Sequence, residues 1–163
     1  MQLFKIISVI LHPIFIPIAT IYISLMLFPS IGFAITRNLN FIYIILFFST
    51  IFIPLISILF LIKINVVSSL EMNDYKERFF PLFITSASMF LGYYILEEIL
   101  IFSVLLRHIM IGAIIIVFTS SIISKYWKIS LHMLALGGLV GVLFSLNFLY
   151  GEIINILIFF ILL

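Results

Sequence analysis

The sequence predicts an all-α protein, a polytopic transmembrane helix bundle with five full spans and a partial sixth. Of the 163 residues, 66% are hydrophobic and only 9% are charged, whereas a soluble domain has about 45–50% apolar and about 25% charged residues. The apolar residues also form continuous runs of roughly 20, the length at which a helix crosses the hydrocarbon core. A chain with so few polar residues cannot cover a soluble surface, so we expect its solvent to be lipid.

The apolar runs place all spans in one transmembrane domain that covers residues 1–163. Full spans are expected near residues 6–28, 41–62, 79–96, 109–123 and 131–149, and a partial span over 153–163. Transmembrane β-strands alternate apolar and polar residues over segments of about ten. The continuous runs here therefore favour helices.

The composition excludes several classes of function. The chain has no cysteine, which excludes disulfides, thiolate metal sites and a cysteine nucleophile. The net charge of +2 comes with no run of basic residues, so no nucleic-acid partner is expected. Membrane lipids are the expected surroundings, and the oligomeric state stays open.

The second link between spans, residues 63–78, is the most polar stretch of the chain and ends with Lys76 and Arg78. An Arg offers a planar fork of donors and a Lys a point charge, so the two together could hold a phosphate. The alternative is a solvated loop with charged anchors at the membrane interface.

The fourth link leads into a span that begins with a histidine, His132. Ionisable groups at the edge of a span are costly and are therefore candidates for a site. Ser130 is placed to cap the helix that starts here, and Gly137, Gly138 and Gly141 predict close helix packing. The alternative is a capped packing helix whose histidine is simply hydrogen-bonded.

The second and fourth links should face the same side of the membrane, because two spans separate them. A Lys/Arg pair and a histidine could then meet over one pocket. These groups suit phosphoryl transfer, in which the histidine attacks phosphorus or moves a proton and the cations bind the phosphate oxygens.

These residues carry a resemblance to a known family. Lys76, Arg78 and Pro81, followed by Ser130-Leu131-His132 with glycines downstream, resemble the type-2 phosphatidic acid phosphatase family, and more specifically a small multi-span group common in Bacteroidetes. The resemblance covers about residues 68–141. Members are all-helical membrane bundles that remove phosphate from lipid phosphates without a metal.

The resemblance implies a role for each matching residue. Lys76 and Arg78 would bind phosphate, Ser130 would donate a hydrogen bond to it, and His132 would be the catalytic general acid. It also implies no cofactor, a lipid phosphate or isoprenoid diphosphate as substrate, and a bacterial inner (cell) membrane as location.

The sequence departs from the family in all three motifs. Lys76 and Arg78 are closer together than the family's pair, and two phenylalanines separate Arg78 from Pro81. Leu131 stands where the second motif has glycine, and no Arg, His or Asp follows His132 to supply the third motif with its nucleophile. One hypothesis is a phosphatase-like enzyme whose third motif lies beyond Leu163. A second is a non-catalytic protein that binds lipid phosphates or serves in assembly. A third, a small transporter, lacks the inverted repeats typical of that class.

The orientation in the membrane stays open, although cytoplasmic links carry an excess of Lys and Arg. The side of the N-terminus would hold six such residues and the opposite side two. If Lys76, Arg78 and Lys128 belong to an anion site, the count falls to three against two. The six are Lys5, Lys63, Lys76, Arg78, Lys125 and Lys128, and the two are Arg37 and Arg107.

Overall fold

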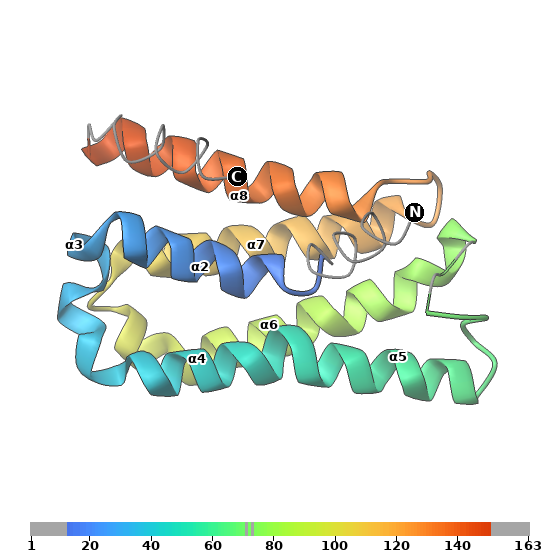
Figure 1. Cartoon of the computed structure of the whole chain (residues 1–163). Helices are drawn as coiled ribbons and strands as arrows, with labels where there is room; N and C mark the ends of the chain where they lie inside the picture. Colours follow the sequence, from blue (N-terminus) through green and yellow to red (C-terminus); the bar gives the residue numbers. More distant parts are fainter. Residues whose placement is uncertain (1–12, 71, 73, 151–163) are drawn as a thin grey trace, which may run out of the picture.

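The computed structural model describes residues 13–70, 72 and 74–150, and all regular structure among them is helical (Figure 1). Two short 3₁₀ segments, η1 (Phe33–Asn38) and η3 (Tyr75–Arg78), and one π-helical segment, η2 (Phe48–Phe52), accompany the α-helices. The α-helices are α2 (Ile16–Leu27), α3 (Pro29–Gly32), α4 (Leu39–Phe47), α5 (Ile53–Lys63), α6 (Phe79–Leu100), α7 (Val104–Ile123) and α8 (Leu131–Tyr150).

Four helical segments of the described part are long and apolar enough to cross a membrane, and α2 is a shorter apolar helix. The chain is therefore a helical membrane protein, and the predicted all-α class is confirmed. The four segments are Pro29–Lys63, Tyr75–Leu100, Val104–Ile123 and Leu131–Tyr150. Residues 6–12 of the predicted first span and the partial span 153–163 lie outside the described residues.

The third link is much shorter than predicted. α6 continues to Leu100 and α7 begins at Val104, so only residues 101–103 connect them. The spans predicted over 79–96 and 109–123 therefore end too early and begin too late, because charged side chains near a helix end can extend along it and keep their polar heads in contact with polar partners. Arg107 does so within α7, where its Nε donates to Tyr93 Oη at 3.1 Å.

The helices run alongside one another and place two links at one end (Figure 1). The α5–α6 connection, residues 64–74, and the α7–α8 connection, residues 124–130, lie at this end, whereas α3, η1 and the α6–α7 turn lie at the other (Figure 1). We call the first of these the basic end. The expectation that the second and fourth links share one side is confirmed.

A packed apolar cluster fills the opposite end of the bundle, and we call it the closing cluster. Lipid is as apolar as these side chains, so close packing and polar bonds between helices must hold this end together. One such bond runs from Ser103 Oγ to the Ile31 carbonyl at 2.7 Å, and it ties the α6–α7 turn to α3. The cluster consists of Ile21, Ile35, Ile42, Leu46, Leu96, Leu100, Leu106 and Met110.

A proline interrupts the helix formed by α4 and α5 and creates the π segment η2. The Ile53 N–H donates to the Phe48 carbonyl, five residues back instead of four. The Ser49 carbonyl then has no backbone N–H from which to accept, because the residue five positions ahead is Pro54, which has no N–H. Ser88 Oγ of α6 supplies the missing bond at 2.6 Å from the Ser49 carbonyl. In the hydrocarbon core no water is available to donate to this carbonyl. The Ser88 bond therefore joins α6 to the proline break in the α4–α5 helix.

Gly92 allows α6 to come this close to η2. A Cβ atom at Gly92 would lie 2.7 Å from Ser49 Oγ and 2.8 Å from Ser49 Cβ. Any larger residue would push the two helices apart at the break. The contact between α6 and η2 therefore depends on the Ser88 hydroxyl and on the absence of a side chain at Gly92.

We expect Ser88→Ala to destabilise the protein, because the Ser49 carbonyl would be left without a donor in an apolar environment. Hydrogen bonds between membrane helices are worth roughly 0.6–1.7 kcal/mol. The midpoint of thermal unfolding in detergent measures the loss. Ser145→Ala is the matched control, since the exposed Ser145 Oγ donates only to Gly141 of its own helix at 2.8 Å. Equal midpoints for the two variants would contradict the role given to Ser88.

Candidate functional site

A large cavity lies inside the bundle and opens at the basic end. Its volume is about 1010 Å³, at the upper limit of the roughly 300–1,000 Å³ typical of ligand pockets. Most of its lining is apolar and comes from α2, α4, η2, α5, α6, α7 and α8. Ile21, Leu46 and Met110 belong both to the lining and to the closing cluster. The packed end of the bundle therefore forms the floor of the cavity.

The ionisable side chains that line the cavity are all basic types. Arg78, Lys128 and His132 line it at the basic end together with Ser130, and His108 lines it from α7. Among the described lining residues none is Asp or Glu. A concave site with basic side chains and no acidic ones attracts anions, so this end of the cavity suits a negatively charged group.

Arg78 joins the two connections at the basic end. Its Nη1 donates to the Ile129 carbonyl at 2.8 Å, and its Nε and Nη2 donate to the Met72 carbonyl at 3.3 and 3.2 Å. The guanidinium is partly buried, so both carbonyls gain a donor where water has limited access. Arg78 thereby joins Met72 of the α5–α6 connection to Ile129 of the α7–α8 connection at the opening of the cavity.

Ser130 caps α8, as the sequence predicted. Its Oγ accepts from the Met133 N–H at 3.4 Å, and its carbonyl accepts from the Leu134 N–H at 3.0 Å. His132 lies in the first turn of α8, and its side chain is exposed. The positive end of the α8 dipole therefore meets the same opening as the basic side chains, which adds to the attraction for an anion.

Lys76 is exposed and does not line the cavity. It lies in η3, where three residues make one turn, so side chains two apart, such as Lys76 and Arg78, diverge. Asp74 fixes this turn because its Oδ1 accepts from the Lys76 N–H at 3.0 Å. Of the predicted site residues, the structure brings together Arg78, Ser130 and His132 and leaves Lys76 outside.

Two lining residues are absent from the predicted catalytic and phosphate-binding set, His108 and Lys128, although the charge count already treats Lys128 as a possible member of an anion site. Lys128 stands two residues before Ser130 in the sequence, and this spacing is the signal that could have identified it as a site residue. His108 lies in α7, where its Nδ1 is 2.6 Å from the Val104 carbonyl. An ionisable residue within a spanning helix is itself a signal for a site.

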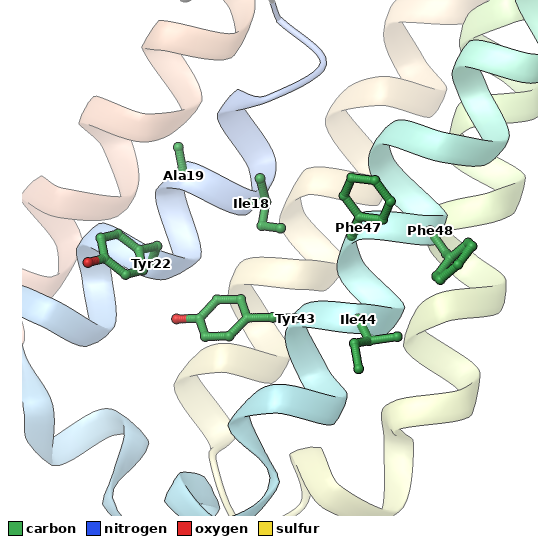
Figure 2. A pocket seen from close by; sticks show the side chains of 7 residues that line it. All are labelled: Ile18, Ala19, Tyr22, Tyr43, Ile44, Phe47 and Phe48. Carbon is green, nitrogen blue, oxygen red and sulfur yellow. The ribbon is translucent and has the colours of Figure 1, made fainter.

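A second, smaller hollow lies between α2 and α4 (Figure 2). Its volume is about 580 Å³, and the rings of Tyr22 and Tyr43 lie across it with centroids 6.4 Å apart. No charged side chain is among the described residues around it, which are Ile18, Ala19, Tyr22, Tyr43, Ile44, Phe47 and Phe48. This hollow offers nothing to bind a phosphate.

Over the described residues, no group of three His, Asp or Glu is arranged to hold a metal ion. Comparisons of the whole chain with protein families, curated proteins and solved structures found no match.

We expect Arg78→Gln to loosen both connections at the basic end. A hydrogen bond from a charged donor contributes about 1.5–3 kcal/mol, which corresponds to about tenfold or more in local opening. Hydrogen exchange of the amides in residues 64–74 and 124–130 measures this opening. Lys76→Gln is the control, because its side chain is exposed. Unchanged exchange in Arg78→Gln would contradict the linking role of Arg78.

Proposed function

We propose that this chain binds a membrane lipid phosphate, with the phosphate at the basic end of the cavity and the hydrocarbon part inside. The observation that supports this function is the division of one cavity into two regions. Arg78, Lys128, Ser130 and His132 line its opening, and the rest of the lining is mostly apolar. An amphiphile with an anionic head matches both regions.

Arg78 can serve both the fold and the ligand. A guanidinium has five N–H donors, and the three bonds to Met72 and Ile129 use one on each nitrogen. One N–H on each terminal nitrogen is left over from these bonds and can donate to a phosphate oxygen. Lys128 adds a second positive charge, and Ser130 and His132 add side-chain donors.

The floor of the cavity favours a binding pocket over a passage. A transporter needs access to its site from both sides of the membrane in turn. Ile21, Leu46 and Met110 of the closing cluster line the cavity, and the cluster's side chains are at least 95% buried, so packed side chains cover part of the cavity toward the opposite end. The transporter hypothesis therefore has less support than lipid binding.

The binding function predicts that Lys128→Gln and His132→Gln each weaken the binding of phosphatidic acid by about tenfold, the equivalent of one charge-assisted hydrogen bond. Native mass spectrometry of the purified protein, titrated with phosphatidic acid, measures the affinity. Lys76→Gln is the matched control, since it removes a charge from the same end but outside the cavity. If all three variants bind equally weakly, general charge attraction and not the site holds the lipid.

Phosphate hydrolysis is the second candidate, favoured by the place of His132 beside Arg78 and Ser130 on one cavity opening. A colorimetric assay of inorganic phosphate, with phosphatidic acid as substrate, distinguishes the two functions. Binding alone predicts no release above a protein-free blank. Release that His132→Ala abolishes would make the protein a phosphatase, and release that survives this change would remove the role given to His132.

We also infer that the cavity opens toward the cytoplasm of a bacterial cell. Lys63, Lys76 and Lys125 are at the basic end and outside the cavity lining, so they count as signals of orientation. Arg78 and Lys128 line the proposed anion site and are not counted, so three lysines at the basic end stand against Arg37 and Arg107 at the opposite end. The excess favours the basic end as the cytoplasmic side.

The absence of cysteine allows a direct test of this orientation. Tyr126→Cys at the basic end and Asn38→Cys at the other both place a thiol at an exposed position. We expect a membrane-impermeant maleimide applied to intact cells to label only Asn38→Cys. Labelling of only Tyr126→Cys would reverse the orientation, and permeabilised cells, in which both thiols should react, serve as the control.

A further inference from the structure

Part of the cavity runs between α7 and α8, two helices that follow one another in sequence. On α7 the lining residues His108, Gly112 and Ile116 are four apart and so share one face. On α8 the lining includes Ala135 and Gly138. The two helices therefore leave space between these faces instead of filling it with side chains.

The glycines on these faces leave open space between α7 and α8 instead of bringing the two helices into close contact. A Cβ atom at Gly112 would meet nothing within 4 Å, and one at Gly138 would meet only Ile116 Cδ1 at 3.9 Å. Gly137 and Gly141 are also open, so the close packing predicted for the α8 glycines is wrong within the described residues. The space beside Gly112 and Gly138 differs from that beside Gly137, because only the first two line the cavity.

We infer that one hydrocarbon chain of the bound lipid lies in the space between α7 and α8, beside Gly112 and Gly138. This inference rests on the proposed function and adds to it the position of one hydrocarbon chain of the lipid. The basic opening decides the occupant, because Lys128 and His132 lie at the start of α8, where this space begins. A phosphate held there directs the rest of the same lipid along α8.

Two residues that line this space also reach the surface of the bundle. His108 and Ile116 line the cavity and are exposed on the surface of the bundle. A lipid can therefore enter sideways between α7 and α8 without leaving the membrane, while its head stays at the level of Lys128. Lateral entry explains how a ligand that is insoluble in water reaches a cavity with a packed floor.

A leucine in place of Gly112 or Gly138 should keep the hydrocarbon chain of the lipid out of this space and leave the phosphate site unchanged. We compare Gly112→Leu and Gly138→Leu with Gly137→Leu, which adds the same side chain outside the cavity. The probes are dioleoyl phosphatidic acid and the short-chain dihexanoyl phosphatidic acid, titrated by native mass spectrometry. Forcing a leucine and a lipid chain into one space should weaken long-chain binding about tenfold, leave short-chain binding unchanged, and have no effect in Gly137→Leu.

Each outcome decides one claim. If the unaltered protein binds neither probe, the proposed function fails and this inference fails with it. If the unaltered protein binds both probes, and Gly112→Leu and Gly138→Leu bind the long-chain probe normally, the hydrocarbon chain lies elsewhere and only this inference fails.

A second measurement covers variants that do not fold. Phosphatidic acid with a photoactivatable diazirine near the end of its chain is crosslinked to the unaltered protein, and the modified residues are found by mass spectrometry. Crosslinks within residues 108–117 and 134–142 support the inference. Crosslinks confined to α2, α4 and α5 overturn it.

Discussion

The position of one guanidinium determines the candidate site. Arg78 stands at the end of η3, just before α6, and donates to carbonyls of both connections at the basic end. Without these bonds, the carbonyls of Met72 and Ile129 would lose a charged donor that joins the α5–α6 connection to the residues just before α8. A neighbouring contact acts in the same sense, since Lys125 Nζ lies 3.6 Å from the centre of the Phe79 ring and so links the end of α7 to the start of α6.

The rest of the bundle follows from the demands of an apolar solvent. Polar backbone groups within lipid must find partners inside the protein, and the proline break in the α4–α5 helix meets this demand through Ser88 of α6. Packing closes the opposite end with apolar side chains. The basic end instead has polar loops and basic side chains. A cavity between these two ends therefore has basic side chains at its opening and mostly apolar side chains elsewhere, as an amphiphilic ligand requires.

The sequence predicted the helical membrane class and the shared side of two links, because both follow from the lengths of apolar runs. It also predicted Ser130 as the cap of α8 and three of the four candidate site residues. It could not predict that Lys76 points away from the cavity, since this depends on the 3₁₀ turn that Asp74 stabilises. Nor could it reveal the open space beside Gly138, because small residues suit both close packing and a cavity, and only the position of α7 decides between them.

The most direct test of the central claim is a distance between the lipid phosphate and Arg78. Solid-state NMR can measure dipolar coupling between ³¹P of phosphatidic acid and ¹³C-labelled arginine side chains in bilayers, with Arg78→Lys used to assign the signal. The chain has two other described arginines, Arg37 and Arg107, which lie at the opposite end and serve as internal controls. The account predicts coupling to Arg78 that is absent for the other two. Coupling to Arg37 or Arg107 alone, or to no arginine, would contradict a phosphate site at the basic end.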